Sequence, residues 1–169
     1  MPLPSLAGKT VAIIGNAPNM SAAQCPAADY TIAVSFGLAH APNAEAHVAI
    51  DGNLPDANYA GLRLVGVPGI EGAEFVYMPY DEVELAPGHT VHIRNNTLSA
   101  IRLAADAGAA HVLVAGQDVE AYEAFHNFQG LKGGLAAIIN EMASREIPVR
   151  VEVLPPPVAQ VAAPTKRPK

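Results

Sequence analysis

Short hydrophobic runs, separated by glycine, proline and polar residues, recur along the chain and predict buried β-strands. The first run, residues 10–15, is rich in β-branched side chains and ends at Gly15. The last run, residues 149–154, alternates hydrophobic and polar positions, which indicates an edge strand. The complete set of predicted strands is residues 10–15, 30–35, 47–50, 62–67, 75–80, 111–115 and 149–154.

Two segments carry hydrophobic residues at the three- and four-residue spacing of an α-helix. The first is residues 97–107. Asn96 or Thr97 can cap its start, and Gly108 can end it. The second is residues 134–146, whose hydrophobic residues form one stripe. The sequence therefore predicts two helices interleaved with the later strands.

Strands that are hydrophobic on both faces and alternate with helices are typical of α/β proteins. We predict one domain, residues 1–154, with an open, mostly parallel Rossmann-like sheet and helices on both faces. Residues 155–169 are rich in proline and end in basic residues, which predicts a disordered tail. In such sheets ligands bind outside the carboxyl ends of the strands, so functional residues are expected directly after each strand.

Composition narrows the possible partners of this domain. Half of the residues are hydrophobic, but only 5% are aromatic, which leaves few rings for stacking on single-stranded nucleic acid. The net charge is −6 although three of the ten basic residues lie in the last four positions, so the body is strongly acidic. An acidic body argues against extensive nucleic-acid contact and against binding to an anionic membrane.

The chain carries no pattern of a secretory signal or of a membrane span, and we expect a cytoplasmic protein. A single cysteine, Cys25, excludes an internal disulfide and a zinc site built from several cysteines. The predicted edge strand at residues 149–154 leaves room for a homodimer.

Small and uncharged polar residues follow the predicted strands and open the first predicted helix. Small residues let the backbone approach a ligand, and amide and hydroxyl groups offer donors and acceptors. The start of the helix adds N–H groups and the positive end of the helix dipole, which suit phosphate or carboxylate. Each position can equally serve only as a turn or a cap. The candidate nucleotide- or substrate-binding residues are Gly15, Asn16, Ala17, Asn19, Ser35, Asn53, Asn96, Thr97, Ser99, Gly116, Gln117 and Asp118.

Two carboxylates and one histidine are candidates for catalysis. Asp51 and Asp118 follow strands, where a carboxylate can hold Mg²⁺ or accept a ribose hydroxyl, or can simply cap the next segment. We take Asp51 as the candidate metal ligand and catalytic carboxylate, with Mg²⁺ as a possible cofactor. His126 is the one plausible general base, with a solvated loop histidine as the alternative. The histidines at strand beginnings are expected to be structural: His47, His89, His92 and His111.

The segment VAIIGNAPNM, residues 11–20, resembles the I-x-G-N/S-G-P-S-L opening of a Rossmann-like group of proteins. That group contains bacterial lipooligosaccharide-type sialyltransferases, motility-associated glycosyltransferase-like proteins and archaeal-type 6-hydroxymethylpterin diphosphokinases. Residues 95–122 are similar to its second signature, a small polar turn that opens a helix, followed by A-x-x-x-G-A/Y-x-x-I-x-L-x-G-x-D. This chain departs from the first signature with Ala17 in place of glycine and Asn19 in place of serine.

The resemblance implies that the chain binds a nucleotide or nucleotide-sugar and transfers a glycosyl or diphosphoryl group. Gly15 and Asn16 would meet the nucleotide phosphates or ribose, and Asp51 or Asn53 would stand at the middle strand end. The diphosphokinases bind ATP with Mg²⁺ and carboxylates, which would also recruit Asp118. The sequence therefore favours a small transferase-like domain. Its alternatives are a nucleotide-binding module without turnover, and a structural role in which the polar strand ends are only caps and turns.

Overall fold

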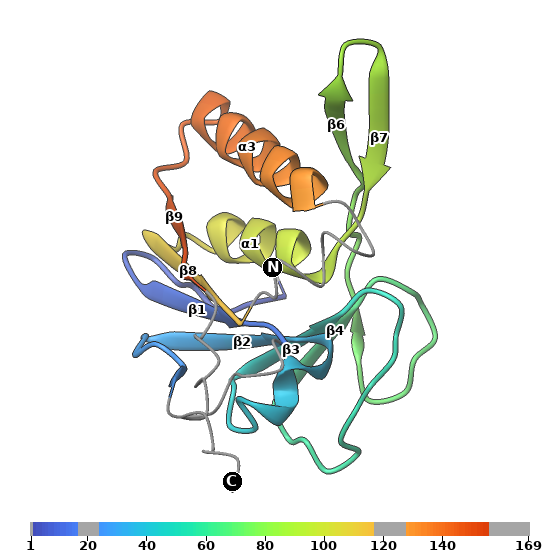
Figure 1. Cartoon of the computed structure of the whole chain (residues 1–169). Helices are drawn as coiled ribbons and strands as arrows, with labels where there is room; N and C mark the ends of the chain where they lie inside the picture. Colours follow the sequence, from blue (N-terminus) through green and yellow to red (C-terminus); the bar gives the residue numbers. More distant parts are fainter. Residues whose placement is uncertain (1, 17–23, 117–127, 156–169) are drawn as a thin grey trace, which may run out of the picture.

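The computed structural model describes residues 2–16, 24–116 and 128–155. Seven strands form one all-parallel sheet in the order β5-β4-β3-β2-β1-β8-β9 (Figure 1). The expected α/β fold with a parallel sheet is therefore confirmed. The strands are β1 Thr10–Ile14, β2 Tyr30–Val34, β3 Ala46–Ala49, β4 Leu62–Val65, β5 Glu74–Phe75, β8 His111–Ala115 and β9 Arg150–Val153.

The order of the strands reverses at β1, which lies between β2 and β8. Val11 of β1 pairs with Tyr30 on one side and with Val112 on the other. The chain runs from β1 through β5 toward one edge and later adds β8 and β9 on the opposite side. The carboxyl ends of the neighbouring strands β1 and β8 are thus the topological switch point, where open parallel sheets bind their ligands.

Both α-helices of the described ranges lie on one face of the sheet (Figure 1). Helix α1, Asn96–Asp106, packs on the central strands, and α3, Phe128–Ser144, packs on α1. The two helices approach closely, since a Cβ at Gly134 would lie 2.5 Å from Cδ1 of Leu98. The opposite face carries a short 3₁₀ helix, η2, Ser35–Ala39. Helices on both faces of the sheet therefore stay a prediction. No helix in the described ranges is long and apolar enough to cross a membrane.

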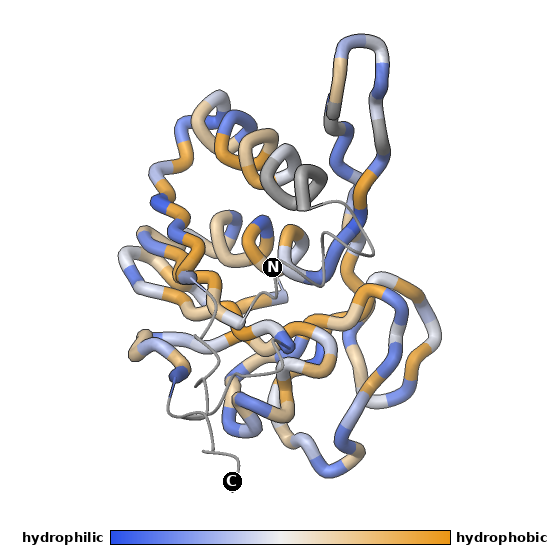
Figure 2. The backbone as a smooth tube through the Cα atoms, in the orientation of Figure 1, coloured by the Kyte–Doolittle hydropathy of each residue, from blue (hydrophilic) through white to orange (hydrophobic). Residues whose placement is uncertain are grey.

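Two hydrophobic clusters lie on the two faces of the sheet. The larger one joins the strands to both helices and includes Ile13, Ile32, Leu98 and Ile138. The smaller one lies on the opposite face around Ile14 and is otherwise mostly alanine. Figure 2 shows the hydrophobic residues concentrated in the strands and in the facing sides of the helices. Packing under the helices therefore supplies most of the apolar burial in the described structure.

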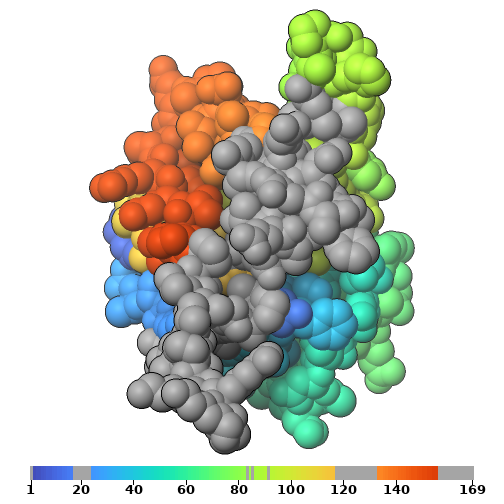
Figure 3. Space-filling view, viewed as in Figure 1, coloured from blue at the N-terminus to red at the C-terminus, as the bar shows by residue number. Residues whose placement is uncertain are grey.

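A protruding hairpin was not predicted. Strands β6, Asp81–Ala86, and β7, His89–Ile93, pair antiparallel and extend beyond the helical layer (Figures 1 and 3). Their turn contains Gly88, whose φ of +78° suits glycine. A longer strand was predicted at residues 75–80. The observed strand β5, Glu74–Phe75, shares only Phe75 with that range. A signal for the hairpin was present, since residues 82–85 and 90–93 alternate polar and apolar positions on either side of a Pro-Gly pair.

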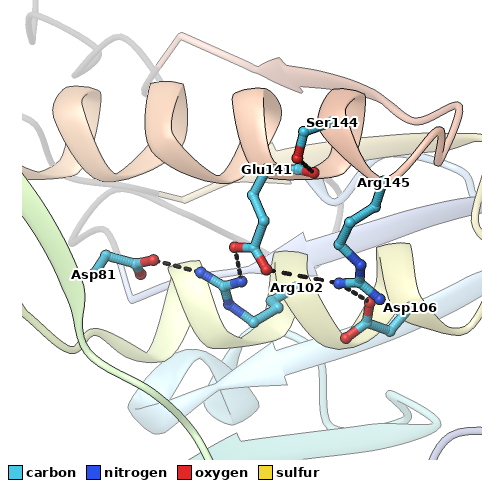
Figure 4. Close-up of polar contacts among 6 residues, drawn as sticks. All are labelled: Asp81, Arg102, Asp106, Glu141, Ser144 and Arg145. Atoms are coloured by element: carbon cyan, nitrogen blue, oxygen red, sulfur yellow. Dashed lines mark hydrogen bonds and ion pairs between the residues drawn. The ribbon is translucent and has the colours of Figure 1, made fainter.

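A group of ion pairs connects the base of the hairpin to the helices (Figure 4). Arg102 of α1 pairs with Asp81 of β6 and with Glu141 of α3. Arg145 pairs with Asp106 at 3.0 Å and with Glu141 at 3.6 Å. Burial raises the pKa of the Asp81 carboxyl, and the neighbouring Arg102 guanidinium opposes this shift. These contacts join three elements that are separate in sequence.

Candidate functional site

The carboxyl ends of β1, β2 and β8 meet at three glycines, which we call the glycine junction: Gly15, Gly37 and Gly116. The Gly15 amide donates a 2.8 Å hydrogen bond to the Ala115 carbonyl. A Cβ at Gly37 would lie 2.2 Å from the Ile14 carbonyl oxygen, and one at Gly116 would lie 2.8 Å from that of Gly15. Gly116 also has a φ of +72°. Both close approaches therefore require glycine.

A hollow of about 620 Å³ lies beside the glycine junction and is within the size range of small-molecule sites. Phe36, in its wall, is a large apolar side chain that stays 50% exposed. The described lining contains one carboxylate and no lysine or arginine. The residues that line the hollow are Asn16, Phe36, Leu38, Ala39, Pro42, Pro55 and Asp56.

The two walls of the hollow are held by buried polar side chains from β3 and β4. His47 Nε2 donates a 2.8 Å hydrogen bond to the carbonyl of Ser35, which directly precedes Phe36. Arg63 donates to the carbonyl of Pro55 at 3.2 Å and also to that of Asp56. His47 is fully buried and Arg63 is 7% exposed. Side chains of β3 and β4 therefore hold the backbone of both walls by hydrogen bonds.

Tyr59, which is half-buried, completes this polar group. Its hydroxyl donates a 2.7 Å hydrogen bond to the Ala44 carbonyl, and its ring contacts that of His47 edge to face at 6.1 Å between centroids. The Arg63 guanidinium lies 5.0 Å from the Tyr59 ring centre, a cation–π distance. We call His47, Tyr59 and Arg63 the polar cluster.

Burial controls the protonation of the polar cluster. It lowers the pKa of His47; the nearby Arg63 charge adds to this effect, and the hydrogen bond to Ser35 opposes it. The imidazole is therefore neutral at pH 7 with its proton on Nε2, and its buried Nδ1 has no partner in the described structure. Burial raises the pKa of Tyr59 to about 12, so its hydroxyl is also neutral.

The candidates at the start of α1 are engaged within the protein. The cap is Asn95 rather than the expected Asn96 or Thr97: its Oδ1 accepts hydrogen bonds from the amides of Thr97 and the next residue, at 2.8 and 3.1 Å. Asn96 Oδ1 accepts a 2.8 Å hydrogen bond from the Ile50 amide at the end of β3. Thr97 and Ser99 are buried. Two of the amides expected to receive phosphate are therefore already satisfied, and Asn96 links α1 to the sheet.

Asp51 lies after β3 and its side chain is exposed. Its Oδ1 accepts a 3.1 Å hydrogen bond from the Asn53 amide, the capping arrangement that was its alternative. No three acidic, histidine or cysteine side chains gather as a possible metal site anywhere in the described ranges. Asp51 as a Mg²⁺ ligand stays a prediction, because one carboxylate together with waters and phosphate oxygens can hold this ion.

The remaining candidates divide into placed and undescribed residues. Asn16 is exposed and lines the hollow, and Gly15 and Gly116 meet at the glycine junction. Ser35 has a φ of +50° and carries the carbonyl bound by His47. Asn53 is exposed and takes part only in the Asp51 turn. The candidates outside the described residues are Ala17, Asn19, Gln117, Asp118 and His126.

Sequence reasoning missed Phe36, Asp56 and the polar cluster. A signal was available, because Arg63 and His47 are isolated polar residues inside the otherwise hydrophobic strands LRLV and AHVA. A charged residue in a buried strand needs a partner, and here that partner is the backbone around the hollow. No protein-family model, curated protein or solved structure matches this chain.

Proposed function

We propose that the chain binds a nucleotide or nucleotide-sugar at the carboxyl ends of β1, β2, β3 and β8. The observation that carries this proposal is the glycine junction at the switch point, which lies beside the 620 Å³ hollow. The close packing of Gly116 on Gly15 brings the carboxyl ends of β1 and β8 together, and the switch point is where such folds bind nucleotides.

The reaction we propose is glycosyl or diphosphoryl transfer, as the resemblance to the sialyltransferase and diphosphokinase group implies. Positioning of the two substrates would supply most of the catalysis. His126 as general base and Asp51 as catalytic carboxylate are carried from the sequence into this proposal. No step depends on Mg²⁺. The proposal also keeps a single cytoplasmic domain with helices on both faces of its sheet, and a homodimer as one assembly.

A nucleotide-binding module without turnover is the second candidate. The lining of the hollow favours it, because the described part offers one carboxylate and no histidine for proton transfer. Such a module would bind the same ligands at the same place. Only product formation separates the two candidates.

Calorimetric titration with nucleotides and nucleotide-sugars, each with and without Mg²⁺, tests the proposal. We expect saturable heat that weakens in Asn16→Ala, since Asn16 lines the hollow. Asn140→Ala, an exposed asparagine on α3, is the matched control and should bind as the wild type does. Mass spectrometry of the same mixtures then detects transfer product. Absence of binding to every nucleotide and nucleotide-sugar would overturn the proposal.

A further inference from the structure

The chemistry of the hollow differs from that of a phosphate site. Phe36 and the two prolines, Pro42 and Pro55, present apolar surface, and the described lining contains no cation. A phosphate placed there would lose its hydration without gaining an opposite charge. An uncharged ring with hydroxyl groups matches the lining better, because rings stack on aromatic surface and hydroxyls donate to carboxylates.

The walls of the hollow are strained and held in place. Ser35 and Asp56 have φ values of +50° and +57°, and they are two of the three non-glycine residues with positive φ in the described chain. Such a conformation costs about 1 kcal/mol or more for a residue with a side chain. His47 and Arg63 bind the carbonyls of these two strained residues. The polar cluster thus maintains the shape of the hollow before any ligand binds.

Asp56 supplies the one carboxylate of the described lining of the hollow. Its Oδ1 accepts a 3.0 Å hydrogen bond from the Asn58 amide, and its Oδ2 has no hydrogen-bond partner in the described structure. The residue is exposed, so Oδ2 can accept hydrogen bonds from a ligand. Two neighbouring hydroxyls of a ribose are a common partner of a single carboxylate in nucleotide sites.

We propose that the hollow binds the nucleoside part of the ligand, with the base on the Phe36 ring and the ribose hydroxyls at the Asp56 carboxylate. The phosphates then extend past Asn16 to the glycine junction. This inference rests on the proposed function and specifies which end of the nucleotide each part of the site takes.

Calorimetry with four probes separates the two ends: a ribonucleoside, its 2′,3′-dideoxy form, inorganic pyrophosphate and the matching nucleoside diphosphate. Phe36→Leu should weaken ribonucleoside binding at least fivefold, because a base stacked on a ring loses that contact. Phe75→Leu is the matched control, since Phe75 is equally exposed but lies on the edge strand β5. Asp56→Asn preserves the turn and should weaken the ribonucleoside but not its dideoxy form.

The outcomes distinguish this inference from the proposed function. Nucleoside diphosphate binding that is unchanged in Phe36→Leu would overturn the inference and leave the proposed function intact. A hollow that binds a free hexose through Phe36 and ignores ribonucleosides would also overturn it. Phe36-dependent binding of the nucleoside, with no gain from its phosphates, would support the placement of the nucleoside in the hollow and overturn the placement of the phosphates at the glycine junction. Absence of binding to all four probes would overturn both.

Discussion

The two faces of the parallel sheet are built from different residues. The face under α1 and α3 is closed by hydrophobic side chains such as Leu98, Ile101 and Ile138, all nearly inaccessible to solvent. The opposite face buries His47 and Arg63 beside small alanines and carries the hollow. The strands are shared, but the interior of the second face holds a histidine and an arginine that bind backbone carbonyls, whereas the interior under the helices is mostly apolar.

This difference separates stability from binding. Burial of apolar area stabilises the fold in proportion to the area removed from water, and the helical face provides most of it. A buried polar group contributes little net stability even when it is hydrogen-bonded. The polar cluster therefore has a different role: it fixes the backbone of the two walls around the hollow. Substitutions on the two faces should consequently have separable effects.

The largest expected loss of unfolding free energy comes from a substitution in the core under the helices. Leu98→Ala removes a buried side chain that contacts Gly134 of α3, and a cavity of this kind costs about 2–5 kcal/mol of unfolding free energy. Urea denaturation measures the loss, and nucleotide affinity of the folded variant should change less than twofold. Ile139→Ala, at a residue 39% exposed on α3, should cost less than about 1 kcal/mol. Equal losses in both variants would contradict the assignment of the core to this face.

The next effect concerns the ion pairs between the hairpin and the helices. Arg102→Met leaves the buried Asp81 carboxylate without its cation and should cost about 2–3 kcal/mol at pH 7. Loss of Arg102 raises the pKa of Asp81 further, so the folded variant binds a proton at higher pH than the wild type. The deficit should therefore shrink as the pH falls from 7 toward 4.5.

Arg145→Met is the control for that measurement, because Arg145 is 47% exposed and its ion pairs are screened by solvent. We expect a loss below about 1 kcal/mol with little dependence on pH. Urea denaturation at the two pH values compares both variants with the wild type. A deficit in Arg102→Met that stays constant with pH would show that the charge of Asp81 is not its cause.

The same contrast between faces explains which elements were predictable. Strands β1 and β8 follow their predicted bounds to within one residue, because both are hydrophobic runs. They are neighbours in the sheet. The hairpin was not predicted, although Glu82 and Glu84 alternate with apolar residues and a Pro-Gly pair marks its turn. Each of its strands alternates over only four residues, the shortest length at which this pattern indicates a strand. Their pairing depends on contacts that a single sequence does not reveal.

The candidate site was predictable only in part. Glycines that follow strands pointed to Gly15 and Gly116, which the fold brings together. The amides at the start of α1 were predicted to be free to bind a ligand, but the Asn95 cap occupies two of them. The sequence alone does not show which asparagine of the Asn-Asn pair is the cap. The polar cluster could not be assembled from the sequence, since its members bind backbone carbonyls seven to fifteen residues away. Sequence patterns identify strand ends more readily than the side chains that shape them.

A smaller effect comes from the polar cluster and depends on pH. Burial lowers the pKa of His47 in the folded state, so the unfolded chain binds the extra proton first as the pH falls. The contribution of His47 to the unfolding free energy is complete above the ordinary pKa of 6.5. It decreases as the pH falls from 6.5 to the lowered pKa of the folded state. One proton limits the slope to about 1.4 kcal/mol per pH unit. Unfolding free energies from pH 7.5 to 5 measure it.

His47→Gln should flatten that dependence because glutamine does not titrate, while its amide can still donate to Ser35. His92→Gln is the control: His92 lies on the hairpin with 63% of its side chain exposed, and it should keep the wild-type slope. If the unfolding free energy of His47→Gln decreased with falling pH as steeply as that of the wild type, His47 would not be the cause of the pH dependence.

The smallest expected effect is at Asp51, which lies between β3 and β4 and outside the lining of the hollow. Asparagine at this position can still accept the Asn53 hydrogen bond, so Asp51→Asn should change the unfolding free energy by less than about 0.5 kcal/mol. If Asp51 only forms this turn, nucleotide affinity and its response to added Mg²⁺ should also be unchanged in calorimetry. Asp56→Asn removes a carboxylate from the same loop and from the hollow itself. A loss of Mg²⁺-dependent affinity in Asp51→Asn alone would instead support Asp51, after β3, as the Mg²⁺ ligand and catalytic carboxylate.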